Sequence, residues 1–194
     1  MTEERNYTAF SDSKCLATGP LTVVLKKTKA WLDREEDARL LIFDDETGRQ
    51  VEFDFSGTLE EVLSRVAPPE GAAKPGRPRL GVIGREVSLL PRHWEWLEEQ
   101  PHGISATLRR LVDEARKREP GKQKARAARD AANRFMTAMA GNLPGYEEAC
   151  RALYAGDAEG FSRETRAWPN DVRKHALRWV HDAARFENED ASSA

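Results

Sequence analysis

With 194 residues, a net charge of −2, 39% hydrophobic and 33% charged residues, the chain has the composition of a globular protein with a charged surface. No apolar run approaches the roughly 20 residues that a membrane-spanning helix needs, and the first five residues lack the basic and apolar regions of a signal peptide. Two distant cysteines outside any CxxC motif favour reduced thiols. We therefore expect a cytoplasmic protein that does not associate with a membrane.

Residues 1–67 predict a small α+β unit with the element order ββαββα. Strands are expected at 7–10, 14–18, 40–43 and 51–55, with the last strand alternating apolar and acidic side chains. Helical spacing of apolar residues predicts helices after Gly19-Pro20 and after Thr58, where Glu61 completes a capping box.

The segment 68–79 is rich in proline, glycine and basic residues and predicts a linker. Within it, Pro75-Gly76-Arg77-Pro78-Arg79 resembles the core of an AT-hook, in which arginine side chains enter the narrow minor groove of A·T DNA. Lys74 extends this basic arm. A solvated linker without a ligand is the alternative interpretation.

Residues 80–119 contain an expected strand at Val82–Leu90 and two short helices. Pro91 is expected to open the first helix, and Ser105 is expected to cap the second. A lone strand with two short helices buries too little apolar surface by itself, so the sequence predicts that a second copy of the chain supplies the partner strand.

This strand–helix–helix pattern resembles the ribbon–helix–helix repressors and antitoxins. The resemblance implies that Glu86 and Ser88 face the major groove and that Ser105 anchors a phosphate. Glu86 departs from the family pattern because a carboxylate is repelled by phosphates. The sequence also leaves open which side chains of the strand face outward, because Leu89 and Leu90 are both apolar. A shift of one residue turns Val87 and Leu89 outward. An ordinary strand and helix pair inside a larger core remains the alternative.

Residues 120–186 predict a helical domain, which we expect to form a C-terminal bundle with helices near 125–139, 146–154, 157–161 and 172–183. Residues 187–194 are acidic or small and are expected to form a disordered tail. The fold class is therefore α+β, with an N-terminal unit, a central ribbon–helix–helix-like segment and this C-terminal bundle.

Four longer stretches resemble an uncharacterised bacterial domain-of-unknown-function family, DUF2239, and this resemblance implies no known activity. They are Leu41–Arg49, Gly76–Leu97, Arg134–Gly145 and Trp168–Asp171.

Patterns typical of enzymes and metal sites are not found in the sequence. Its four histidines lack metal-ligand spacing, and it contains no GxSxG, P-loop or GxGxxG motif. Asp44, Asp45 and Glu46 precede Gly48 and are interpreted as hairpin-turn residues rather than cation ligands. We expect no catalytic activity, no cofactor and no bound metal.

Charge is distributed unevenly along the chain. Between Lys74 and Arg134, 15 Lys and Arg face 8 Asp and Glu, a net charge of +7, which leaves −9 for the rest. A basic centre is typical of a surface that binds a polyanion. We expect a homodimeric regulator that binds double-stranded DNA through Lys74, Arg77, Pro78, Arg79, Arg85, Glu86, Ser88, Ser105 and Arg109. The alternative, which Glu86 favours, is an interaction or scaffold protein whose central segment only dimerises.

Overall fold

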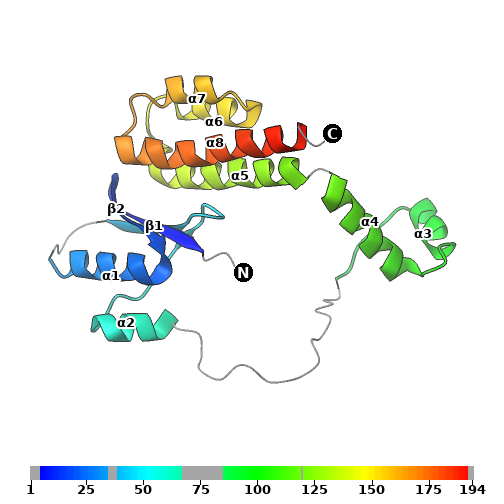
Figure 1. Cartoon of the computed structure of the whole chain (residues 1–194), viewed down its shortest axis with the longest axis horizontal. Helices are drawn as coiled ribbons and strands as arrows, with labels where there is room; N and C mark the ends of the chain where they lie inside the picture. The colour runs from blue at the N-terminus through cyan, green and yellow to red at the C-terminus, as the bar shows by residue number, and fades with distance from the viewer. Residues whose placement is uncertain (1–4, 35–38, 67–84, 119, 192–194) are drawn as a thin grey trace. The chain divides into compact units, whose positions relative to one another are not determined.

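The computed structural model describes residues 5–34, 39–66, 85–118 and 120–191 (Figure 1). It divides into two compact units. The sheet unit consists of residues 1–66 and 120–194, and the central unit consists of residues 67–119. The class is α+β, as the sequence predicts.

A four-stranded antiparallel sheet forms the middle of the sheet unit, with strand order β2-β1-β3-β4. The strands are β1 (Asn6–Ser11), β2 (Lys14–Pro20), β3 (Leu40–Asp44) and β4 (Gln50–Val51). The predicted first hairpin is confirmed, and its turn contains Asp12 at a positive φ of 49°. Asparagine and aspartate tolerate this left-handed conformation better than most residues.

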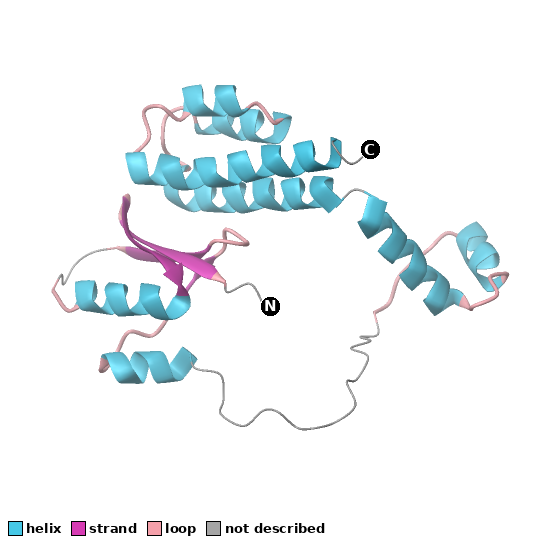
Figure 2. Ribbon diagram, viewed as in Figure 1, coloured by secondary structure: helices cyan, strands magenta, loops and turns pink. Residues whose placement is uncertain are grey.

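Both faces of the sheet are covered because its central strands alternate two sets of apolar side chains. Ala9 and Ile42 belong to the cluster that includes Val24 of α1 (Leu21–Leu32). Phe10 and Phe43 belong to the larger cluster on the other face, which is built with the C-terminal helices. Figure 2 shows the sheet between these two layers of helix.

The fourth strand is shorter than the sequence predicts, because β4 ends at Val51 instead of Phe55. Beyond this strand, Arg65 of α2 (Leu59–Val66) binds the backbone, since its Nη1 donates to the carbonyl oxygens of Asp54 and Ser56 at 3.1 and 2.8 Å. These bonds connect the backbone after β4 to the helix. The predicted capping box is present: Thr58 Oγ1 accepts from the Glu61 amide, and Glu61 Oε2 accepts from the Thr58 amide.

Four helices follow in the sheet unit: α5 (Pro120–Ala140), α6 (Tyr146–Ala155), α7 (Ala158–Glu164) and α8 (Asn170–Ala191). Helices α5 and α8 lie side by side against the sheet (Figure 1). Phe135 and Trp179 stack within the cluster that also contains Phe10 and Phe43. Residues 1–66 therefore share one core with residues 120–191, although the sequence interpretation treated them as separate domains.

The last helix also extends further than expected. Residues 187–191 continue α8, whereas the sequence predicted a disordered tail from residue 187. A specific contact accounts for part of this extension, since Arg129 Nη2 of α5 donates to Glu187 Oε2 at 2.7 Å. The side chain of Arg129 is 15% exposed, so this ion pair is partly shielded from solvent.

The central unit contains two described helices, α3 (Pro91–Glu98) and α4 (Ile104–Arg118). Pro91 occupies the first turn of α3, as predicted from its fixed φ. Gly103 has a positive φ of 73° and ends the connection between the two helices. None of the helices in the described part of the chain is both long and apolar enough to cross a membrane.

Candidate functional site

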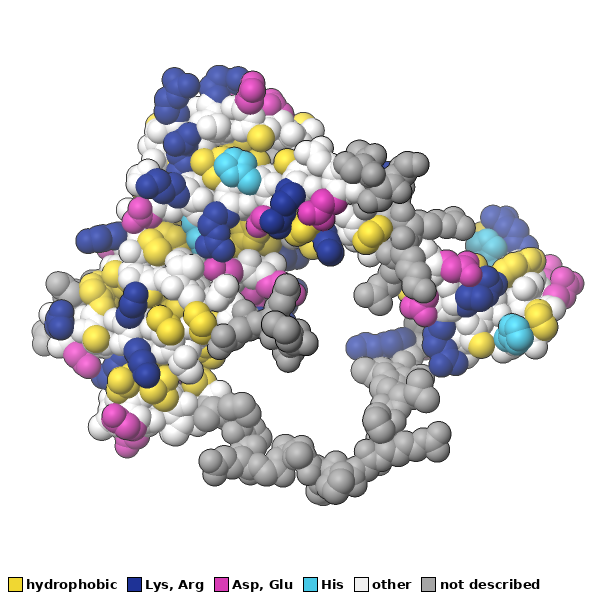
Figure 3. Space-filling model, in the orientation of Figure 1, with side chains coloured by type: hydrophobic (Ala, Val, Ile, Leu, Met, Phe, Trp, Pro, Cys, Tyr) yellow, Lys and Arg dark blue, Asp and Glu magenta, His cyan; other side chains and the backbone are white. Residues whose placement is uncertain are grey.

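Helices α3 and α4 present an apolar face that the described residues leave open. Seven large hydrophobic residues are exposed in the described chain, and five of them are in the central unit. They include Trp96 at 46% exposure and Val112 at 55%, and the others are Val87, Leu90 and Leu111. Figure 3 shows hydrophobic side chains at the surface of this unit among charged ones. Such a concentration of exposed apolar surface is typical of an interface.

A groove of about 440 Å³ runs along this face. Its apolar lining comes from both helices and from Leu89, two residues before α3, and Arg92 and His93 lie among these apolar side chains. The lining residues are Leu89, Arg92, His93, Trp96, Leu97, Leu108 and Leu111. Leu97 is buried in this face, whereas Leu111 and Val112 are exposed.

The stretch before α3 has no regular secondary structure in its described part, residues 85–90. Its side chains are mostly exposed, including Arg85, Glu86 and Ser88. A ribbon strand requires a partner chain, so the strand expected at Val82–Leu90 remains a prediction. Residues 82–84 of that strand, and Lys74, Arg77, Pro78 and Arg79 of the basic arm, lie outside the described residues.

The predicted capping role of Ser105 is wrong. Helix α4 begins at Ile104, and the Thr107 amide donates to the carbonyl of Gly103, so Gly103 is at the cap. Ser105 lies inside the first turn, where its carbonyl accepts from Nε of Arg109 at 3.0 Å. Glycine replaces the expected cap because a positive φ is needed to turn the chain into α4.

The positive charge of the middle of the chain lies partly on α4. This helix carries five basic and two acidic residues, a net charge of +3, and three of the basic residues, Arg116, Lys117 and Arg118, lie at its end. Helix α3 carries one arginine and two glutamates, a net charge of −1. The charge argument for DNA binding therefore applies to the end of α4 and not to α3.

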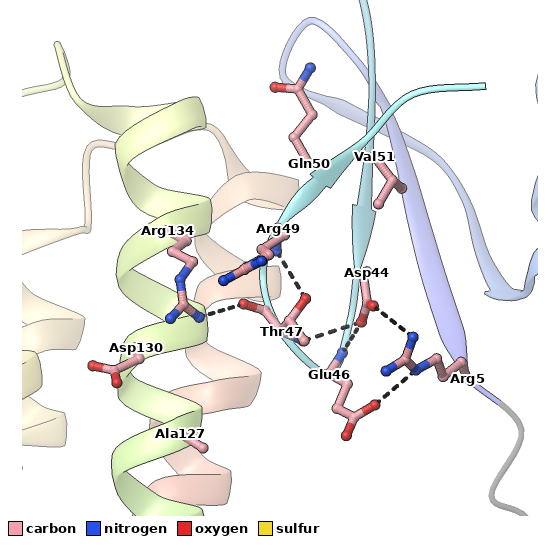
Figure 4. Close-up of a pocket in the computed structure, with 10 residues that line it drawn as sticks. All are labelled: Arg5, Asp44, Glu46, Thr47, Arg49, Gln50, Val51, Ala127, Asp130 and Arg134. Atoms are coloured by element: carbon pink, nitrogen blue, oxygen red, sulfur yellow. Dashed lines mark hydrogen bonds and ion pairs between the residues drawn. The ribbon is translucent and has the colours of Figure 1, made fainter. Parts of the chain in front are cut away.

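A second candidate site lies in the sheet unit, between the β3–β4 turn and α5. This hollow has a volume of about 680 Å³ (Figure 4). Three arginines and three acidic residues line it, together with short polar and apolar side chains. The lining residues are Arg5, Asp44, Glu46, Thr47, Arg49, Gln50, Val51, Ala127, Asp130 and Arg134.

The turn at the edge of the hollow is fixed by its own hydrogen bonds. Asp44 Oδ1 accepts from the amides of Glu46 and Thr47 at 2.8 and 3.2 Å, an arrangement that aspartate commonly provides in turns. The amide of Asp44 donates to the Arg49 carbonyl at 3.0 Å, and the amide of Gly48 donates to the Asp44 carbonyl at 2.8 Å. Asp44 and Glu46 are therefore turn residues, in agreement with the sequence interpretation.

Gly48 brings this turn against the backbone of α5. It has a φ of +66°, and a Cβ at this position would overlap the carbonyl oxygen of Ala131. Nearby, Arg134 Nη1 donates to the carbonyl oxygen of Thr47 at 2.8 Å. Only glycine combines this conformation with such a close approach, and the result is that Arg49 is held next to α5.

The acidic residues of the hollow already have partners. Arg5 Nε donates to Glu46 Oε2 at 3.1 Å, and Arg5 Nη1 lies 3.9 Å from Asp44 Oδ2. These contacts raise the pKa of Arg5, with the Glu46 hydrogen bond as the largest cause. Asp130 accepts from the Tyr154 hydroxyl at 3.3 Å. Each carboxylate of the hollow therefore has a hydrogen-bond or ion-pair partner already. The charged groups of the hollow that can still bind a ligand are the guanidinium groups of Arg49 and Arg134.

A buried polar cluster centred on Asp45 joins the sheet to α8 beside this hollow. Thr8 Oγ1 donates to Asp45 Oδ1 at 2.8 Å, and Arg178 Nη2 donates to Oδ2 at 3.2 Å. The Asp45 carbonyl accepts from Trp179 Nε1 at 2.9 Å, and His175 Nε2 lies 3.5 Å from Oδ1. Burial raises the pKa of Asp45, whereas burial and then Arg178 lower the pKa of His175 to about 3.

This cluster joins secondary-structure elements and does not form an accessible site. Asp45, His175 and Thr8 are 9%, 5% and 0% exposed, so a ligand cannot reach the carboxylate without displacing protein. Sequence reasoning assigned Asp45 to the turn together with its neighbours. Its distinct role depends on α8, which lies more than 120 residues later in the chain.

Sequence reasoning also missed the arginines of the hollow. Arg49 and Arg134 each lie in a stretch quoted for the family resemblance, but 85 positions separate them. Nothing in the local pattern of either stretch indicates that the two side chains share a cavity. In the described residues, no group of three His, Cys, Asp or Glu gathers as a metal ion would require.

Residues from the stretches that carry the family resemblance form hydrogen bonds between elements of the sheet unit. Trp168 Nε1 donates to the Pro144 carbonyl at 2.8 Å. Asp171 Oδ2, at the start of α8, accepts from the amide of Cys15 in β2 at 3.0 Å. These contacts connect α8 to the loop before α6 and to the sheet.

The sheet unit and the two central helices define an α+β protein with an open apolar face and a polar hollow. The chain matches the model of the family described as "Uncharacterized protein conserved in bacteria (DUF2239)" over residues 6–180. It therefore belongs to this family. No curated protein and no solved structure gives a significant match.

Proposed function

We propose that the chain is a cytoplasmic, non-catalytic DNA-binding protein that acts as a homodimer and regulates transcription. The observation that carries the proposal is the open apolar face of α3 and α4, which follows a stretch without regular secondary structure, residues 85–90. In this arrangement the central segment dimerises, and the basic arm at residues 74–79 contacts DNA.

A second copy of the same chain is the partner that fits the central unit best. Residues 85–90 form no strand ladder, and within the described residues only the carbonyl of Leu90 has a backbone partner, the amides of His93 and Trp94. Two identical stretches paired antiparallel around a twofold axis would satisfy these backbone groups. The same pairing would cover the exposed Val87 and Leu90 beside the stretch.

Oligomeric state is the first test of this proposal. The full chain is expected to have a mass in solution of twice 21.9 kDa by light scattering coupled to size exclusion. Val112→Glu places a charge on the open face and should yield the monomer, because burying an unpaired carboxylate in an interface is unfavourable. Val23→Glu is the matched control, since Val23 is 38% exposed on α1 of the sheet unit. A monomeric wild-type chain would contradict the proposed dimer.

The DNA part of the proposal rests on the sequence. Arg77 and Arg79 flank a proline in an arm with the composition of a minor-groove binder, beside a segment with the ribbon–helix–helix pattern. Arg85 and Arg109 would add phosphate contacts on either side of α3. In this proposal Glu86 and Ser88 face the bases.

Fluorescence anisotropy with a mixed pool of duplex DNA over a salt series tests this part. We expect affinity that falls steeply with salt, and the Arg77→Ala/Arg79→Ala double variant should bind more weakly with a shallower slope. Absence of binding by a folded dimer at low salt would refute the DNA proposal.

A second candidate function is a dimeric scaffold that binds another protein. The net charge of −1 on α3 and the exposed carboxylate of Glu86 favour it. A dimer that does not bind DNA in the anisotropy experiment would support this candidate.

A further inference from the structure

We propose that the hollow between the β3–β4 turn and α5 is a binding site for a small anionic molecule. The guanidinium groups of Arg49 and Arg134 would hold its carboxylate or phosphate group. The site lies in the sheet unit and does not depend on the central segment, so it can be tested independently of the proposed DNA binding.

The first argument is the placement of the two arginines. Arg49 follows the β3–β4 turn, and Arg134 comes from the middle of α5, yet both line the same hollow. Figure 4 shows the Arg49 side chain on the side of Arg134, whose guanidinium group is directed at Thr47. Two like charges in one cavity repel each other, and an anion between them removes this repulsion.

The second argument is that these two arginines have hydrogen-bonding capacity to spare. Arg134 donates one N–H to the Thr47 carbonyl, and within the described residues neither guanidinium is paired with a carboxylate. Arg5 differs, because it is occupied by Glu46 and Asp44. Guanidinium groups bind the oxygens of carboxylates and phosphates in bidentate geometry, which suits both anions.

The third argument is that the site is already organised. The backbone at Arg49 is fixed by three contacts. These are the packing of Gly48 on Ala131, the hydrogen bond from Arg134 to Thr47 and the hydrogen bonds of the Asp44 turn. A preformed site binds more tightly because less ordering accompanies binding.

The size and lining of the hollow indicate a small molecule. About 680 Å³ falls within the range of small-molecule pockets, roughly 300–1,000 Å³. Val51 and Ala127 offer apolar contact beside the arginines, and Gln50 offers an amide. The ligand class is therefore a compact anion with a short uncharged body.

Isothermal titration calorimetry of the full chain at low ionic strength tests the proposal, with pyrophosphate and citrate as separate probes. We expect saturable binding of at least one probe with one site per chain. Binding of pyrophosphate alone would identify a phosphate site, and binding of citrate alone would identify a carboxylate site.

Variants then locate the site. Arg49→Gln and Arg134→Gln should each weaken binding by roughly tenfold or more, the loss expected for one charged hydrogen-bonded contact. The Arg49 side chain makes no hydrogen bond or ion pair in the described structure, so Arg49→Gln tests binding without disturbing the fold. Arg151→Gln is the control, because Arg151 is an exposed arginine of α6 that pairs with Glu148 outside the hollow.

Three results would overturn the proposal. These are no binding of either probe at millimolar concentration, equal weakening by Arg151→Gln, and unchanged binding in Arg49→Gln. A parallel anisotropy titration with duplex DNA separates the two sources of phosphate. If the Arg49 and Arg134 variants weaken DNA binding while neither small anion binds, the pair contacts a nucleic-acid backbone and the small-molecule site is refuted.

Discussion

Substitution of Gly48 by alanine tests how tightly the β3–β4 turn is packed on α5. A Cβ at residue 48 would overlap the carbonyl oxygen of Ala131 and lie 2.6 Å from its carbonyl carbon and 2.8 Å from its Cα. These are backbone atoms of a long helix, so the turn must move. The new side chain would also have a φ of +66°, which is strained for an L-residue.

The magnitude can be worked from these contacts. The left-handed conformation costs about 1–2 kcal/mol for a residue with a Cβ. Moving the turn away from α5 adds about 1–3 kcal/mol, typical of overpacking, and loss of the bond from Arg134 to Thr47 adds about 1 kcal/mol. We expect Gly48→Ala to lower the free energy of unfolding by about 3–6 kcal/mol.

Gly156→Ala is the matched control within the same unit. Gly156 also has a positive φ, +71°, but its Cβ would meet only side-chain ends, Arg129 Nη2 at 3.1 Å and Glu187 Oε2 at 3.9 Å. Its expected loss is therefore only the conformational part, about 1–2 kcal/mol. Urea unfolding followed by far-ultraviolet circular dichroism measures both variants. If they lose equal stability within about 0.5 kcal/mol, the close packing of the turn on α5 is refuted.

Two further predictions concern the sheet unit. His175 has a folded pKa of about 3, below its ordinary 6.5, so its neutral form stabilises the fold above pH 6.5 and this contribution is lost as the pH falls toward 3. Between pH 6.5 and 5 the wild type should lose on the order of 2 kcal/mol more than His175→Gln in urea unfolding. The raised pKa of Asp45 acts in the opposite direction but is present in both proteins, and equal slopes would exclude His175 as the cause. Asp157 Oδ1 caps α7 by accepting from the Gly160 amide at 2.8 Å, so Asp157→Ala should lower the melting temperature through a loss of about 1 kcal/mol, and Asp157→Asn should retain most of the stability. Equal melting temperatures for the wild type and Asp157→Ala would contradict the capping role.

Local chemistry explains why much of the secondary structure could be predicted. The first hairpin, α1 and the Thr58–Glu61 capping box each depend on residues within a few positions of one another. The start of α3 at Pro91 follows from the fixed φ of proline in the same way. The family resemblance, carried by four separate stretches, was confirmed by the match over residues 6–180.

Errors arose where a distant side chain contacts the predicted segment. The strand predicted to Phe55 ends at Val51, and Arg65 of α2 binds two of the carbonyls that follow it. The predicted tail is helical to Ala191, and Glu187 within it is held by Arg129 of α5. In both cases the contact partner was too far along the chain for a local pattern to reveal it.

The sequence by itself determined the α+β class, the ββαββα order of the N-terminal part and the turn at residues 44–48, because these follow from short-range periodicity and turn chemistry. Tertiary structure alone decided that α5 and α8 share a core with the N-terminal sheet and that Asp45 is buried against α8. It also decided that Arg49 and Arg134 line one hollow. The physical reason is that burial and charge pairing depend on distance in space, and residues 85 positions apart have no local signal that they will meet.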